Sequence, residues 1–173
     1  EVGWYGWLPY AFAGVGSLVG GWFSAWLMRR GKSLHAARRI SLGIGAFLLP
    51  AAIVIAFTHS FASTPYLAVA FACLAFLGHQ WWSVLMMTLT PDLFPSRLVG
   101  SAAGLIGMAE LMGSALFAEL VGLILEATGR DYTIPFLLAG VLHPIAFMLI
   151  CIFIKKIGPL ARFRELQPDF AKT

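Results

Sequence analysis

The sequence predicts an all-α membrane protein with five transmembrane helices. Of its 173 residues, 60% are hydrophobic and only 12% are charged, whereas about a quarter of the residues in soluble domains are charged. A soluble domain of this length could bury a core, but it could not hide this much apolar surface. The net charge of +4 does not indicate nucleic-acid binding, because the basic residues flank apolar stretches instead of decorating a polar scaffold.

Five apolar stretches are long enough to cross a bilayer. A hydrocarbon core about 30 Å thick requires about 20 helical residues. Helix is the expected structure, since lipid offers no partner for unpaired backbone groups. Pro50 and Pro144 lie inside the second and fifth stretches and are expected to kink them. The stretches cover residues 4–28, 40–57, 65–90, 98–126 and 133–154.

The positions of lysine and arginine predict the orientation. Eleven of these residues fall on one side of the predicted spans, and only Arg130 falls on the other. By the positive-inside rule the basic side is cytoplasmic, which places Glu1 outside and Thr173 inside. Residues 1–157 then form a transmembrane bundle and 158–173 a cytoplasmic tail, with Trp4, Tyr5 and Trp7 as an outer aromatic anchor. The eleven are Arg29, Arg30, Lys32, Arg38, Arg39, Arg97, Lys155, Lys156, Arg162, Arg164 and Lys172.

An odd number of spans with an outward N-terminus suggests a missing helix. Many secondary transporters are built of six-helix halves, each made of two inverted three-helix repeats. Five spans running from outside to inside fit such a half without its first helix. The chain also begins at Glu1 without an initiator Met, so we expect it to be a fragment.

A glycine-rich and basic segment connects the first two spans. Residues 20–32 read GGWFSAWLMRRGK, and Gly21, Arg29, Arg30 and Lys32 are its key positions. This segment resembles the inter-helix loop signature of the major facilitator superfamily, although Ala25 stands where that signature has an acidic residue. The general alternative is a basic anchor loop that only sets the topology.

A second run of residues carries a more specific resemblance. Its residues are 3–5, 7–10, 16–18, 78–83, Thr88, Leu89, Asp92, Phe94, Pro95, 99–101, Gly104, 107–109, Val121, Gly122, Leu125, Thr128 and Gly129. In these residues the chain looks like the hexuronate transporters of the anion:cation symporter family, and the resemblance maps it to their helices eight to twelve. The resemblance implies proton-coupled import of a sugar acid across the inner membrane. It also implies a small anionic substrate, a proton and the missing N-terminal half as partners, and no cofactor.

Polar residues in the third span are candidates for a substrate path. Helical spacing predicts one face with His79, Trp82, Ser83, Met86 and Thr90, and an adjoining face with Gln80, Val84 and Met87. Donors and acceptors beside an indole would suit sugar hydroxyls. The alternative is that these groups only bond neighbouring helices. The candidate path residues are His79, Gln80, Trp82, Ser83, Met87 and, on the next span, Glu110.

Glu110 lies near the centre of the fourth span, where a charged carboxylate costs at least about 2.5 kcal/mol. It could be neutral, could pair with His79 or His143, could bind substrate hydroxyls, or could couple transport to protons together with His79. An ionised carboxylate would repel an anionic substrate, so a transporter of neutral sugars is the alternative function. His143 itself is expected to be packed or paired.

Other features have simpler readings. Gly100, Gly104 and Gly107 form a row suited to close helix contact, as a static or a sliding surface. Glu119 and Glu126 are expected to reach the outer interface. The sequence contains no nucleotide loop, nucleophile elbow or metal-ligand spacing, so we predict neither an enzyme nor a metal site. A non-transporting membrane subunit, or a metalloenzyme built on His79, Glu110 and His143, is far less favoured.

Overall fold

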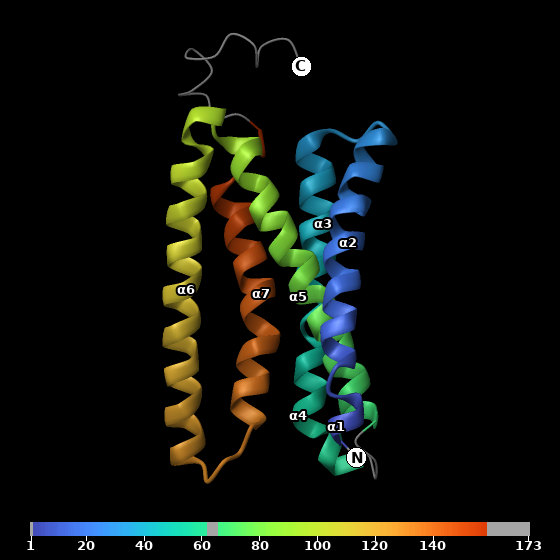
Figure 1. Cartoon of the computed structure of the whole chain (residues 1–173), viewed down its shortest axis with the longest axis vertical. Helices are drawn as coiled ribbons and strands as arrows, with labels where there is room; N and C mark the ends of the chain where they lie inside the picture. The colour runs from blue at the N-terminus through green and yellow to red at the C-terminus, as the bar shows by residue number, and fades with distance from the viewer. Residues whose placement is uncertain (1, 62–65, 159–173) are drawn as a thin grey trace.

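The computed structural model describes residues 2–61 and 66–158, and all of its regular elements are helices (Figure 1). The expected tail, 158–173, therefore lies outside the described residues except for Gly158. The helices are α1 (Val2–Tyr5), α2 (Leu8–Arg29), α3 (Leu34–Leu48), α4 (Ala51–Phe61), α5 (Tyr66–Leu93), α6 (Ser96–Ala127) and α7 (Thr133–Phe153).

The prediction of five transmembrane helices is confirmed. Helices α2, α5, α6 and α7 are each long and apolar enough to cross a membrane, and α3 and α4 together form the remaining span, Leu34–Thr58. The chain interrupts that span where Pro50 was expected to disturb it, since α3 ends at Leu48 and α4 begins at Ala51. Pro144, in contrast, lies within a continuous α7.

The second span begins six residues earlier than the apolar stretch suggested. Ser33 caps α3, because its hydroxyl accepts a hydrogen bond from the backbone N–H of Ala36 at 3.3 Å. Serine is a favoured N-cap residue because it satisfies a donor that the first helical turn leaves free. The extra turn brings His35, Arg38 and Arg39 into the helix.

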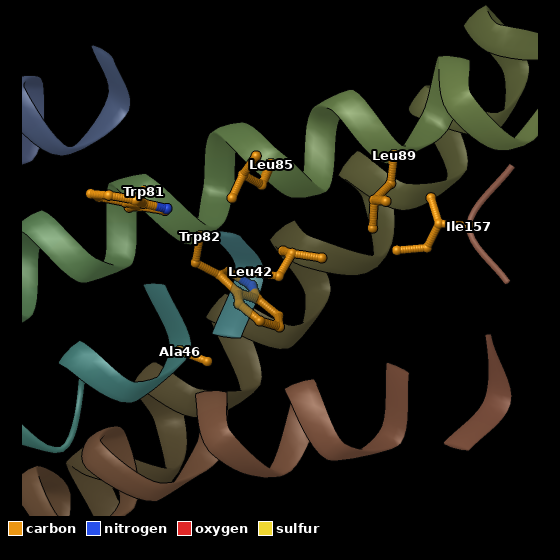
Figure 2. Close-up of a cluster of buried hydrophobic side chains, with 7 residues drawn as sticks. All are labelled: Leu42, Ala46, Trp81, Trp82, Leu85, Leu89 and Ile157. Atoms are coloured by element: carbon orange, nitrogen blue, oxygen red, sulfur yellow. The ribbon is translucent and has the colours of Figure 1, made fainter. Parts of the chain in front are cut away.

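Small residues allow α2 and α3 to lie close against α5. A Cβ added to Gly20 of α2 would come within 2.8 Å of the Trp81 ring, and one added to Gly45 of α3 would come within 3.0 Å of the Trp82 nitrogen. Glycine at these positions permits the backbones to approach. The core therefore forms where these helices meet. Figure 2 shows its members, which are Leu42, Ala46, Trp81, Trp82, Leu85, Leu89 and Ile157.

Helix α6 stands apart from this core (Figure 1). No residue of α6, all of which the structure describes, is buried. A Cβ added to Gly100, Gly104 or Gly107 would meet nothing within 4 Å in the described chain. The glycine row that was expected to be a close-contact surface is thus uncovered here, and the close contacts are made by glycines of α2, α3, α5 and α7 instead.

The turn after α2, the α5–α6 junction and the end of α7 lie at the same end of the molecule (Figure 1). The basic residues of these three segments therefore share one end, as the sequence indicated. Their assignment to the cytoplasm stays a prediction.

Candidate functional site

One strip of α5 is only partly covered by the other helices. His79 and Met87 are exposed, and Gln80 and Ser83 are half-buried. Successive residues of a helix are turned by about 100°. On this basis the other three residues, Ser83, Met87 and Gln80, lie within about 100° of His79 around the helix axis and so share its side. Four of the candidate path residues thus form one partly open surface in the middle and the second half of the span.

Trp82 does not share this surface. Its side chain is only 8% exposed and belongs to the core cluster with Leu42 and Ala46 (Figure 2). The helical turn places Trp82 about 60° from His79, on the side away from Ser83. The predicted face of α5 included Trp82 together with His79 and Ser83. In this chain Trp82 packs in the core, as the packing alternative expected. Thr90, near the α5–α6 junction, is also covered, at 2% exposed.

Two histidines meet between α5 and α7. The rings of His79 and His143 lie edge to face with centroids 5.4 Å apart, and the Trp82 ring lies 5.7 Å from that of His143. Nδ1 of His143 is buried and has no hydrogen-bond partner in the described part of the chain. His143 is thus packed against His79 and Trp82.

Glu110 is exposed, within a run of nine exposed residues, 108–116. The half-buried residues of α6 centre on one side of the helix, and position 110 lies on that side, four residues after Ile106. The half-buried residues are Leu98, Val99, Ala102, Ala103, Ile106, Gly107, Phe117, Val121, Ile124 and Leu125. Glu110 therefore lies on the side of α6 that faces the rest of the chain, in the stretch where contact is lost.

The structure does not join Glu110 to the histidines. Among the described residues, Glu110 has neither an ion pair nor a hydrogen bond. No group of three or more described His, Cys, Asp or Glu side chains is placed to hold a metal ion, so His79, Glu110 and His143 do not assemble a metal site. Glu119 and Glu126 are exposed near the far end of α6.

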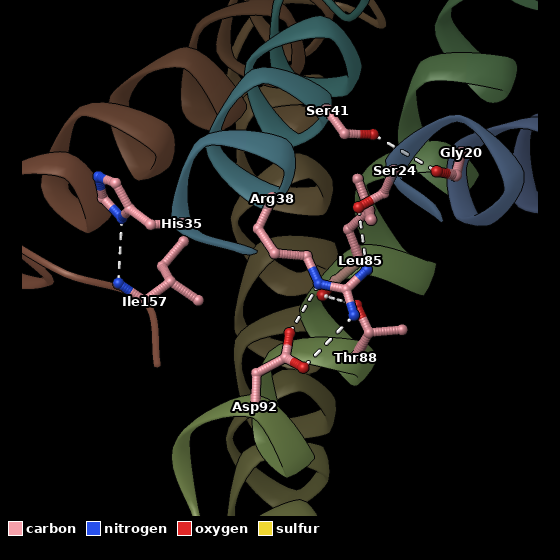
Figure 3. A network of polar contacts seen from close by, with 9 residues as sticks. All are labelled: Gly20, Ser24, His35, Arg38, Ser41, Leu85, Thr88, Asp92 and Ile157. Atoms are coloured by element: carbon pink, nitrogen blue, oxygen red, sulfur yellow. Dashed lines mark hydrogen bonds and ion pairs between the residues drawn. The ribbon is translucent and has the colours of Figure 1, made fainter. Parts of the chain in front are cut away.

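A polar network at the basic end joins three helices (Figure 3). Arg38 of α3 forms an ion pair with Asp92 of α5, with Nε 2.6 Å from Oδ2 and Nη2 3.4 Å from Oδ1. Its Nη1 donates to the Ser24 hydroxyl of α2 at 2.9 Å. The Arg38 and Asp92 side chains are only 12% and 15% exposed, so solvent screens this pair weakly.

The neighbouring polar groups extend these ties. Trp81 Nε1 donates to the Ser41 hydroxyl at 3.0 Å, and Ser41 donates to the Gly20 carbonyl at 3.4 Å. Nδ1 of His35 accepts from the backbone N–H of Ile157 at 3.0 Å (Figure 3). Arg39 donates to the Cys151 carbonyl at 3.2 Å.

Sequence reasoning assigned Arg38 and Arg39 only to the basic loop and missed this network. A usable signal was Asp92, an acidic residue at the end of a span on the basic side. The residues of the predicted loop signature lie outside this network. Arg29, Arg30 and Lys32 are exposed. A Cβ added to Gly21 would meet nothing within 4 Å.

Comparison with known proteins identifies the relatives of this chain, although no family model matches it. It is 33% identical over 135 residues to the hexuronate transporter of Escherichia coli (strain K12), an alignment that covers 75% of this chain and 29% of that protein. The chain is a homologue of the anion:cation symporters of the major facilitator superfamily. This confirms the resemblance drawn from residues 3–18 and 78–129.

Two further relatives extend the comparison. The D-galactonate transporter of Escherichia coli O6:H1 is 26% identical over 152 residues, covering 87% of this chain and 34% of that protein. The probable galactarate/D-glucarate transporter of Bacillus subtilis (strain 168) is 28% identical over 174 residues, covering 98% and 36%. The chain thus spans about a third of the length of these relatives. All are transporters, so the homology is to transporters and not to enzymes.

Proposed function

We propose that this chain is the C-terminal part of a secondary active transporter that imports a sugar acid together with protons. The names of its relatives support a sugar-acid substrate, since they specify hexuronate, D-galactonate and galactarate or D-glucarate. The eleven-to-one distribution of lysine and arginine supports an inner-membrane orientation with Glu1 outside and Thr173 cytoplasmic.

The uncovered strip of α5 carries the proposal. His79, Gln80 and Ser83 offer hydrogen-bond donors and acceptors inside a membrane span, yet the described part of the chain covers the strip only partly. Polar side chains at such a depth gain nothing from lipid and normally face a bundle interior or a water-filled path. Together with Met87, they provide the wall on which hydroxyl and carboxylate groups of the substrate bind.

Glu110 faces the same region from α6 and is the proposed proton carrier, with His79 as the second candidate. The neutral form of the Glu110 carboxyl can donate a hydrogen bond to a substrate carboxylate, whereas the ionised form repels it. Proton binding at Glu110 would thereby favour substrate binding, which is the linkage that symport requires.

The test is uptake of radiolabelled hexuronate or galactonate by the transporter that contains this chain. His79→Ala and Gln80→Ala should each raise the KM at normal expression, because each removes a substrate hydrogen bond of about 0.5–1.5 kcal/mol. Leu74→Ala is the matched control, since Leu74 is exposed on another side of the same helix. Unchanged kinetics in both variants would refute the path, and loss of folded protein would indicate that these residues are structural.

A transporter of neutral sugars is the second candidate. It is favoured by one observation, the absence of any cation paired with Glu110 in the described chain. A neutral hexose that competes with hexuronate uptake as strongly as galactonate does would select this candidate.

A further inference from the structure

Two tryptophans and an arginine form a stack on α2, near its basic end. The rings of Trp22 and Trp26 are stacked with centroids 6.4 Å apart, and the guanidinium of Arg30 lies over the Trp26 ring at 5.2 Å. The three residues are spaced i, i+4 and i+8, so they follow one side of the helix. Trp22 is 57% exposed and lies about 160° around the helix from Gly20, which faces α5.

The local backbone holds this stack in place. Phe23 stacks on Trp26 with centroids 5.7 Å apart and also contacts Trp81 of the core. The helix then ends in a Schellman motif, in which Gly31 N–H donates to the Met28 carbonyl and Lys32 N–H to the Leu27 carbonyl. Gly31 has a φ of 84°, which glycine adopts without strain. Arg30 and Lys32 are therefore fixed just beyond the end of the span.

The cations here have no anionic partner among the residues that the structure describes. Arg29, Arg30 and Lys32 are exposed, and their side chains have no hydrogen bond or ion pair among the described residues. Asp92 is the single acidic residue that the structure describes at this end, and Arg38 binds it. The Arg30 guanidinium lies over the Trp26 ring, and its N–H groups have no hydrogen-bond acceptor among the described residues, so they can bind an anion.

We propose that the Trp22–Trp26–Arg30 stack, with Arg29 and Lys32, binds the phosphate of an anionic phospholipid. The Arg30 fork and the Lys32 ammonium would bind the phosphate oxygens, while the exposed Trp22 indole lies beside the first part of an acyl chain. The depth fits, because α2 ends at Arg29 and tryptophan prefers the headgroup level of a bilayer. Charge complementarity selects a lipid with a net negative headgroup.

Native mass spectrometry of the full transporter, titrated with phosphatidylglycerol or phosphatidylcholine of the same chain length, tests this site. Phosphatidylglycerol should bind more tightly than phosphatidylcholine. The double variant Arg29→Gln/Arg30→Gln should lower its affinity by about fivefold for each cation removed. Trp26→Leu should weaken binding by about two- to fivefold through loss of the cation–π contact, and Trp26→Phe should restore most of it.

The matched control is Lys155→Gln/Lys156→Gln, which removes two exposed cations at the same end of the molecule (Figure 1). It should change the affinity much less than Arg29→Gln/Arg30→Gln. An equal loss in the control would overturn the proposal in favour of diffuse attraction. Unaltered binding in Arg29→Gln/Arg30→Gln would also overturn it and would mean that other helices of the transporter cover this side of α2. Displacement of the lipid by inorganic phosphate would show a free-phosphate site instead.

Discussion

Asp92→Ala should destabilise the transporter by leaving the Arg38 guanidinium without its counter-ion. The two side chains are 12% and 15% exposed and share two contacts, at 2.6 and 3.4 Å. Removing one member of a fully buried pair costs about 3–5 kcal/mol. The residual exposure and the remaining bond from Arg38 to Ser24 at 2.9 Å reduce this, so we expect a loss of about 2 kcal/mol in the free energy of unfolding.

The assay is thermal unfolding of the detergent-solubilised transporter, with Glu126→Gln as the control because Glu126 is exposed near the opposite end. Asp92→Ala should lower the apparent Tm clearly and Glu126→Gln should leave it unchanged. The double variant Arg38→Met/Asp92→Leu should be more stable than Asp92→Ala, since it leaves no unpaired charge. If Asp92→Ala unfolds at the wild-type temperature, the ion pair does not hold α3 against α5 and the reasoning fails.

Three further predictions follow from the same structure. Gly20→Val should abolish folded protein because its side chain would overlap the Trp81 ring, which an added Cβ already approaches to 2.8 Å; normal expression of this variant would contradict the close α2–α5 contact. A cysteine introduced at Arg130 should react with a membrane-impermeant reagent from outside only, and labelling from the cytoplasmic side would reverse the topology. Glu110→Gln should retain substrate binding and flatten the pH dependence of uptake, whereas Glu119→Gln should not; a wild-type pH profile at the wild-type rate would remove Glu110 from proton coupling.

The spans could be predicted from the sequence because a bilayer imposes length and apolarity on every crossing segment. The same rule could not find where α3 begins. Its first two turns carry His35, Arg38 and Arg39, which interrupt the apolar pattern and are stabilised by long-range partners. Two of these partners, Asp92 and Ile157, lie 54 and 122 residues away along the chain. Ser33, a favoured N-cap residue, was the one local signal for this start, whereas the partners themselves could not be read from nearby sequence.

The candidate path residues of α5 could likewise be predicted only in part. Spacing alone groups His79, Trp82 and Ser83, and a helical wheel cannot say where the uncovered strip ends. The limit depends on where α3 contacts α5. Gly45 brings the α3 backbone close to Trp82 and leaves His79 and Ser83 outside the contact. The pairing of His79 with His143 was equally out of reach, since it requires α7 to lie beside α5.

Helix α6 has no buried residue, but its three sides differ in residue type, and this difference indicates what each side contacts in the transporter. Leu105, Leu116 and Leu123 are exposed and lie on one side, where contact with lipid stabilises them. Gly100, Gly104 and Gly107 lie on another, and glycine offers lipid no apolar side chain but allows a helix to approach. Glu110 lies on the third side, toward the rest of the chain, where it has no hydrogen-bond or ion-pair partner among the described residues. We therefore expect a further helix of the transporter to cover the glycine side, which would enclose Glu110 and the strip of α5 in one path.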